Sequence, residues 1–170
     1  MAHYFLQKIA SGLDAINAAI GNAAQWLTLI MVLVQFMVVI LRYVFGIGSI
    51  QLQEAIIYMH GILFLSAAAA TWQDDSHVRV DVFYATASEK TKARINFLGT
   101  VFFAIPLTVL ILYVSFEYVS MSWAVRESSR ETSGLPCLFV FKTFILIFAV
   151  QILAQGISIL CRGGKLTPQT

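Results

Sequence analysis

Long apolar runs separated by short polar segments dominate the chain. Four runs are long enough to cross a membrane, over about residues 22–44, 51–72, 95–122 and 137–160. In the second run, the stretch from Ala55 to Trp72 carries no formal charge. At helical rise it reaches about 27 Å, close to the thickness of a bilayer's hydrocarbon core. The pattern predicts an all-α integral membrane protein, with four transmembrane helices in a single membrane domain over residues 1–170.

Residues 1–20 have an amphipathic pattern. Apolar residues recur at helical spacing, and the positions between them hold Gln7, Lys8, Ser11, Asp14 and Asn17. Two structures fit this pattern, an interfacial helix or a cytoplasmic extension of the first span. We favour the extension.

The connection between the second and third spans, residues 73–94, is densely charged. Within nine residues it contains Asp74, Asp75, His77, Arg79 and Asp81. The alternation that follows would suit a strand, but an isolated strand at a membrane surface would leave its backbone groups unpaired. We therefore predict a turn followed by a short interfacial helix. The segment from Thr86 to Glu89 then predicts a capping box that opens the helix leading into the third span. Within that span, Pro106 removes one backbone hydrogen bond and permits a kink.

The basic residues predict the orientation. With both termini on one side, that side holds Lys8, Arg79, Lys90, Lys92, Arg94, Arg162 and Lys165. The other side holds Arg42, Arg126, Arg130 and Lys142. The positive-inside rule then places both termini and the 73–94 connection in the cytoplasm.

Composition restricts the possible functions. Charged residues make up only 12% of the chain and hydrophobic residues 59%, whereas soluble domains carry about 25% charged residues. The net charge of +2 is small and the basic residues are dispersed, so we expect no nucleic-acid partner. Cys137 and Cys161 lie at opposite ends of one predicted helix and cannot pair within the chain. No metal-binding spacing is present. We expect no metal, no cofactor and no enzymatic activity.

Four ionisable residues lie near the outer ends of the spans: Arg42, Glu54, Glu117 and Lys142. Each pair flanks an outer loop, so Arg42 can face Glu54, and Lys142 can face Glu117, at similar depth. Alternatively, these side chains extend to water at the interface. Both alternatives remain open for each pair.

The outer loop, residues 126–136, contains Arg130 and Glu131 among several polar residues. A solvated turn, with Glu127, Arg130 and Glu131 on one helical face, is the favoured interpretation. The functional alternative is a docking surface for a protein outside the membrane. We take the charged residues of these segments as candidate structural or partner-contact groups, namely Arg42, Glu54, His77, Arg79, Asp81, Glu117, Arg130, Glu131 and Lys142.

Several short motifs occur in a characteristic order. The segment Arg42-Tyr-Val-Phe-Gly46 closes the first span, Gln53-Glu54 opens the second, and His77-Val-Arg-Val-Asp81 follows it. Further on come Arg130-Glu-Thr-Ser-Gly-Leu-Pro136, Lys142 and Gln155-Gly156. From about Gln25 to Leu160, the chain resembles the small, DctQ-like membrane subunit of the tripartite ATP-independent periplasmic (TRAP) transporters.

The resemblance implies a multi-pass protein of the bacterial inner membrane, with no catalytic chemistry of its own. In this family, the small subunit pairs with a large membrane subunit that binds substrate and sodium. A periplasmic solute-binding protein delivers the substrate, usually an organic acid. The resemblance therefore implies an accessory subunit that braces the large one in a sodium-coupled symporter embedded in the lipid bilayer.

Two alternatives come from other classes of protein. The first is a self-sufficient, homo-oligomeric four-helix carrier that uses Glu54 or Glu117 to bind a proton. That mechanism needs a carboxylate near mid-membrane in an early helix, which the pattern does not provide. The second is a haem anchor or membrane enzyme subunit, which would need a partner histidine facing His60 at the same depth. For Arg79 and Asp81 we favour a structural role.

Overall fold

The computed structural model describes residues 2–77 and 84–166, and within these ranges its regular elements are all helical. They are α1 (Ala2–Ala24), α2 (Trp26–Tyr43), α3 (Ile50–Gln73), α4 (Glu89–Gly99), the π-helical turn η1 (Thr100–Ala104), α5 (Ile105–Ala124) and α6 (Leu138–Cys161). Four continuous helical stretches of this described part are long and apolar enough to cross a membrane: Tyr4–Tyr43, Ile50–Gln73, Glu89–Ala124 and Leu138–Cys161. The predicted all-α architecture with four spans is confirmed.

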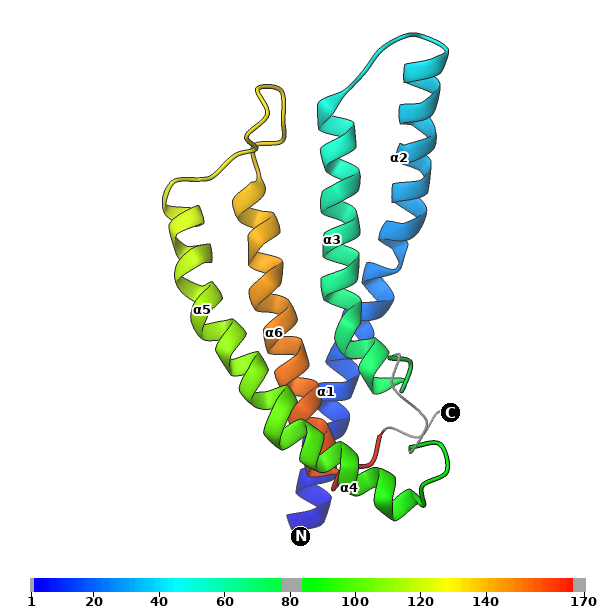
Figure 1. Ribbon diagram of the computed structural model, residues 1–170, viewed down its shortest axis with the longest axis vertical. Coiled ribbons are helices and arrows are strands. Elements are labelled where there is room, and N and C mark those ends of the chain that lie inside the picture. Colours follow the sequence, from blue (N-terminus) through cyan, green and yellow to red (C-terminus); the bar gives the residue numbers. More distant parts are fainter. Residues whose placement is uncertain (1, 78–83, 167–170) are drawn as a thin grey trace.

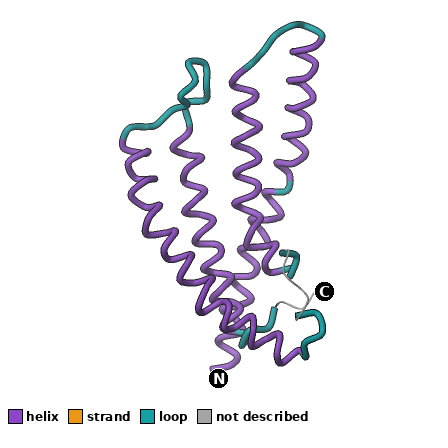
Figure 2. The backbone as a smooth tube through the Cα atoms, viewed as in Figure 1, coloured by secondary structure: helices purple, strands orange, loops and turns teal. Residues whose placement is uncertain are grey.

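The helices form an open row rather than a closed bundle. Figure 1 shows the order α5, α6, α3, α2 across the molecule. The packing agrees, because α6 contacts α5, α3 and α1, whereas α2 contacts only α3 and α1 among the described elements. Figure 2 shows the two connecting loops, residues 44–49 and 125–137, at one end, which we call the loop end. Both termini and α4 lie toward the other, which we call the terminal end.

The N-terminal helix α1 continues into α2 with a single interruption at Gln25, as the favoured extension predicts. Its sides are reversed relative to a soluble amphipathic helix. Asp14 and Asn17 are buried against the other helices, whereas Phe5 and Ile16 are 65% and 58% exposed. In a membrane protein this arrangement is favourable, since the apolar side can face lipid while the polar side chains find partners inside the protein.

Local hydrogen bonds set the beginnings of α3 and α4. Ser49, in an extended conformation, accepts a hydrogen bond from the backbone N–H of Leu52 and so caps α3. Ser88 caps α4 in the same way, accepting from the N–H of Thr91. The predicted capping box at Thr86 is therefore wrong, because the chain is still in a turn there.

The segment before α4 bears only partly on the sequence predictions. The predicted interfacial helix stays a prediction, because residues 78–83, including Arg79 and Asp81, lie outside the described residues. Within the described part, α4, η1 and α5 follow one another without a break (Figure 1).

The third span changes its winding just before Pro106. The N–H of Ile105 bonds to the carbonyl of Thr100, five residues back, and this contact closes the wide turn η1. Pro106 then occupies the first turn of α5, where its missing N–H costs least. The predicted disturbance at Pro106 is present as a π-helical turn, a common cause of helix bending.

The C-terminal end of α6 turns back across α4. Gly163 and Gly164 have φ angles of +65° and +84°, and their N–H groups bond to carbonyls in the last turn of α6. A Cβ on Gly164 would overlap the carbonyl of Ala93, so this close crossing requires glycine. Cys137 and Cys161 lie at opposite ends of α6 and are both free, as predicted.

Candidate functional site

A polar cluster at the loop end fastens the loop of residues 125–137 onto two helices. Glu54, in the first turns of α3, accepts hydrogen bonds from the hydroxyl of Ser129 and, at 2.7 Å, from the N–H of Leu135. A Cβ on Gly134 would overlap Ser129 and the Glu54 carboxylate, so a glycine is needed there. The loop is therefore neither a free solvated turn nor a helix. It is a folded cap on α3.

Lys142 and Glu127 form the second half of this cluster. The Lys142 ammonium, buried in the first turns of α6, makes a salt bridge with Glu127 and lies 4.0 Å from the centre of the Tyr118 ring. Glu127 also accepts a hydrogen bond from Ser122 at 2.7 Å. The hydrogen bonds from Lys142 and Ser122 hold the pKa of the Glu127 carboxyl below its ordinary value.

Neither of the two possible ion pairs, Arg42 with Glu54 or Lys142 with Glu117, is present among the described residues. Glu54 bonds to the loop and not to Arg42, and Lys142 pairs with Glu127 and not with Glu117. The sequence pattern correctly placed Arg42, Glu54, Glu117 and Lys142 toward the loop end of their helices. However, the nearer partners come from the 125–137 loop, whose folded path the sequence pattern does not reveal.

The remaining candidate residues are dispersed over the surface. Arg42, Glu117, Arg130 and Glu131 are exposed, and no salt bridge among the described residues involves them. His77 is also exposed, with its Nε2 atom 3.1 Å from the carbonyl oxygen of Ala68. The structure thus brings Glu54 and Lys142 together through the loop that also contains Arg130 and Glu131, whereas Arg79 and Asp81 lie outside the described residues.

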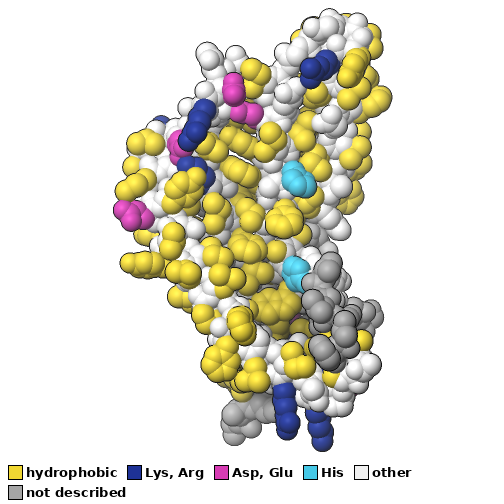
Figure 3. All heavy atoms as spheres, viewed as in Figure 1, with side chains coloured by type: hydrophobic (Ala, Val, Ile, Leu, Met, Phe, Trp, Pro, Cys, Tyr) yellow, Lys and Arg dark blue, Asp and Glu magenta, His cyan; other side chains and the backbone are white. Residues whose placement is uncertain are grey.

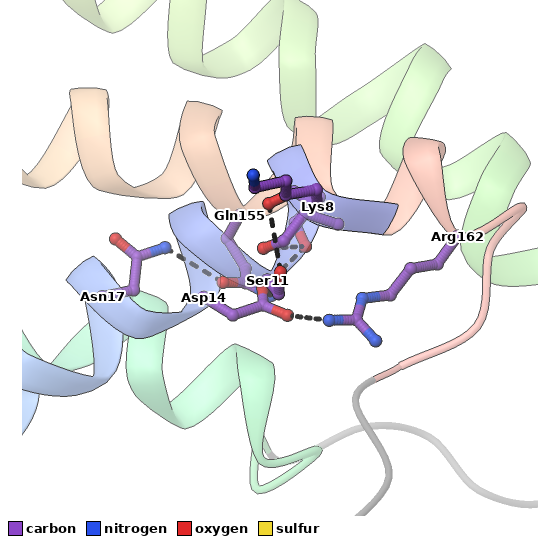
Figure 4. A network of polar contacts seen from close by, with 8 residues as sticks. Lys8, Ser11, Asp14, Asn17, Gln155 and Arg162 are labelled. Atoms are coloured by element: carbon purple, nitrogen blue, oxygen red, sulfur yellow. Dashed lines mark hydrogen bonds and ion pairs between the residues drawn. The ribbon is translucent and has the colours of Figure 1, made fainter. Parts of the chain in front are cut away.

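A second polar cluster, which the sequence patterns did not single out, lies buried between α1 and α6 (Figure 4). Asp14 forms an ion pair with Arg162 at 2.5 Å and accepts hydrogen bonds from Ser158 at 2.6 Å and Gln155 at 3.3 Å. Asp14 is only 4% exposed. An unpaired carboxylate at this depth would be costly, so the contacts from α6 are what make its burial possible.

The same cluster extends to α3. Asn17 donates to the side-chain oxygen of Gln155 at 2.9 Å, and Gln151 donates to the carbonyl of Ser66 at 3.2 Å. All three helices are thereby joined by side-chain hydrogen bonds. Two features of the sequence could have indicated this cluster. Asp14 and Asn17 are three residues apart and so share one helical face. The fourth apolar span also contains polar residues at helical spacing, namely Gln151, Gln155 and Ser158.

A third group of polar residues faces outward on the α2–α3 side. Gln35, Arg42 and Gln53 line a shallow groove of about 400 Å³ between the two helices, and all three are exposed. His60 is exposed on α3, near the middle of that span, and no hydrogen bond within the described residues satisfies it.

The clustered carboxylates are engaged within the protein. The described residues contain no group of three or more His, Cys, Asp or Glu side chains placed to hold a metal ion. Comparison with curated proteins and with solved structures finds no significant match.

A protein-family comparison does find a match. The model of the DctQ component of the tripartite ATP-independent periplasmic transporters matches residues 31–163, most of the chain. This range includes three complete spans, most of α2 and both loop-end connections. Together with the four apolar helices, the match shows that this chain is a multi-pass membrane protein belonging to the DctQ family, the small component of TRAP transporters.

Proposed function

We propose that this chain is an accessory subunit that braces the large membrane subunit of a sodium-coupled TRAP symporter. Such a symporter takes up an organic acid that a periplasmic solute-binding protein delivers. Family membership supports a role within a tripartite transporter. The open row of helices supports the bracing role, because α2 buries no residue within this chain and has a wide apolar surface available for another helix.

The observation that carries this proposal is the exposed His60. An imidazole near mid-span that has no hydrogen-bond partner among the described residues would face hydrocarbon, which is unfavourable. A polar group on the large subunit would satisfy it, and the same reasoning applies to Gln35 on α2. The α2–α3 side is therefore the face we assign to the large subunit.

The orientation follows from the charges at each end. Among the described residues, the terminal end holds Lys8, Lys90, Lys92, Arg94, Arg162 and Lys165, whereas the loop end holds Arg42, Arg126, Arg130 and Lys142. The positive-inside rule favours a cytoplasmic terminal end in the bacterial inner membrane. The loop end then faces the periplasm, where exposed Arg130 and Glu131 are suited to contact the solute-binding protein. For Arg79 and Asp81 we keep the structural role.

The self-sufficient carrier has less support. Glu54 is held by two hydrogen bonds from the loop, and Glu117 is exposed toward the loop end of α5. Neither carboxylate lines one of the larger described hollows, and a proton-coupled carrier needs a titratable group that reaches a substrate path.

The test is reconstitution. This chain would be purified from its native membrane in mild detergent, and the co-purifying proteins identified by mass spectrometry. Proteoliposomes would then be prepared with this chain alone, or with the larger partner and the solute-binding protein under a sodium gradient. We expect a large multi-span protein in equal amount, and organic-acid uptake only in the full set. Uptake by the single chain would refute the proposal.

A further inference from the structure

A mostly apolar groove opens near the terminal end, between the last turn of α3, the η1–α5 segment and α6. Its volume is about 660 Å³, within the range typical of ligand sites. The walls include Trp72, Phe103, Leu107, Phe148 and Ile152. Figure 3 shows the broad hydrophobic surface on this side of the molecule, with basic side chains below it at the terminal end.

Most polar groups in the groove are engaged within the protein, including His77, whose Nε2 atom lies 3.1 Å from the carbonyl oxygen of Ala68. Tyr84 and Asn96 bond to each other through the phenol and the amide, with Nδ2 of Asn96 donating to the phenolic oxygen at 3.0 Å. The Thr100 and Thr108 hydroxyls donate to backbone carbonyls one turn earlier, at 2.7 and 2.6 Å. Most of the remaining lining is apolar, and a hydrocarbon chain is the ligand that fits it.

The mouth of the groove has the opposite character. Tyr84, Asn96 and Leu166 also line a second hollow of about 1010 Å³, so the two hollows adjoin at these residues. Lys90, Lys92, Arg94 and Lys165 line this hollow, with Asp75 and Glu89. Lys92 is paired with Glu89 at 3.1 Å. No salt bridge among the described residues engages the other three cations, so the mouth has unneutralised positive charge.

The dimensions match one bilayer leaflet. From Asn96 at the mouth to Ile111 at the far end, the wall rises about 22 Å along the helix. One leaflet contributes about 15 Å of hydrocarbon, and a tilted groove of this length covers that depth.

We propose that this groove binds one anionic phospholipid, with its headgroup among Lys90, Arg94 and Lys165 and an acyl chain along η1 and α5. The charge complementarity selects an anionic headgroup over a zwitterionic one, and each cation near such a headgroup strengthens binding by roughly fivefold. The lipid would lie beside the terminal end of α3 and along α5, two helices that share no direct contact among the described elements.

Trp72 provides a direct test because it lines the groove. The full-length chain with Trp26→Phe and Trp123→Phe keeps Trp72 as its single tryptophan. It would be titrated in detergent with phosphatidylglycerol or phosphatidylcholine carrying brominated acyl chains, which quench nearby tryptophan. We expect saturable quenching of Trp72 by both lipids' acyl chains, with half-maximal quenching at a several-fold lower mole fraction for phosphatidylglycerol than for phosphatidylcholine. This measurement requires neither transport activity nor a known topology. A negative result would therefore refute lipid binding without bearing on the proposed function.

Two matched pairs of variants locate the site. A Cβ at Gly99 or at Gly12 meets no atom within 4 Å, but only Gly99 lines the groove. We expect Gly99→Leu to abolish the selective quenching and Gly12→Leu to preserve it. The double variant Arg94→Gln/Lys165→Gln should weaken phosphatidylglycerol binding by about 25-fold. Arg126→Gln/Arg130→Gln removes the same charge at the loop end and should leave it unchanged.

Three results would overturn the proposal. Equal quenching by both lipids would mean that only non-selective boundary lipid reaches Trp72. An absence of quenching would mean that another part of the protein fills the groove. Selective quenching that survives Gly99→Leu would place the anionic lipid elsewhere.

Discussion

Helices α2 and α6 belong to spans of the same mean hydropathy, 2.3 in the most apolar window of each, yet they occupy opposite environments. Helix α6 lies inside the row and buries seven residues, most of them polar or small, including Lys142, Gln151 and Gln155. Helix α2 lies at the edge and buries none. Hydropathy therefore predicts that a helix enters the membrane but not where it lies within the protein.

The polar residues account for this difference. Those of α6 have partners in the same chain, as Lys142 has in Glu127 and Gln155 has in Asn17. Those of the α2–α3 side, such as Gln35, Arg42 and His60, have none among the described residues. In a solvent that cannot supply hydrogen bonds, satisfied polar groups mark internal packing, and unsatisfied ones mark a surface that meets another molecule.

The largest expected effect is at the α1–α6 contact. Asp14→Asn removes the charge that pairs with Arg162, and breaking a buried ion pair is strongly destabilising. We expect a loss of about 3 kcal/mol in the free energy of unfolding, measured by SDS titration from mixed micelles. Glu117→Gln, at an exposed position, is the control and should change this free energy by less than about 0.5 kcal/mol. Equal effects would show that the buried network does not hold α1 in place.

The loop-end cap should be the next most sensitive. Glu54→Gln retains one acceptor but loses the charge that strengthens two hydrogen bonds, so we expect about 1.5 kcal/mol of destabilisation. Gly134→Ala should destabilise the same cap, because its Cβ overlaps Ser129 and Glu54. Limited proteolysis of the 125–137 loop provides the readout. Gly48→Ala, with open space around its Cβ, should leave cleavage unchanged, and cleavage unaltered in both cap variants would contradict this account.

A substitution on the α2–α3 side should affect assembly with the large subunit rather than the stability of the isolated chain. His60→Leu should leave the isolated chain as stable as the unmodified protein but weaken its association with the large subunit, by roughly 10-fold for an interface contact of this kind. Co-purification at graded detergent concentrations measures this effect. Tyr113→Leu, at the α5 edge, is the matched control because Tyr113 is 81% exposed. If Tyr113→Leu weakened assembly and His60→Leu did not, the large subunit would bind the opposite edge.

The smallest expected effect is a pH dependence at the loop end. The pKa of Glu127 is lowered in the folded protein from an ordinary value of 4.5. The unfolded chain therefore binds the proton first, so the stabilisation is complete above about pH 4.5 and is lost as pH falls through the lower, folded pKa. Unfolding midpoints measured between pH 3 and pH 7 should decline in this acid range. The decline should be smaller in Glu127→Gln, and an identical decline would assign it to other carboxylates.

Much of the fold could be predicted from the sequence alone. The four spans, the helical extension before the first span, the disturbance at Pro106 and the separation of the two cysteines all follow from local pattern. The capping of α4 by Ser88 rather than Thr86 was a near miss, because two hydroxyl residues compete within one turn and the sequence does not say where the chain leaves its extended conformation.

The partners of the charged residues could not be predicted in this way. The sequence showed that Lys142 lies near the end of a span, where a carboxylate could pair with it. It pairs with Glu127 and not with Glu117 because the 125–137 loop folds back over α3 and α6. Asp14 and Asn17 lie on the polar side of an amphipathic pattern, and the pattern does not show what that side faces. In this protein that side faces α6.

The sequence by itself determined that this chain lies in a membrane, how many helical stretches are long and apolar enough to cross it, and roughly where along the chain they lie. These properties depend on apolar length and on hydrogen bonds between near neighbours. Only the tertiary structure decided that α6 is central and α2 peripheral, and which polar side chains are left for a partner. That decision rests on contacts between residues more than a hundred positions apart, as between Asp14 and Arg162, and such contacts leave no periodic trace along the chain.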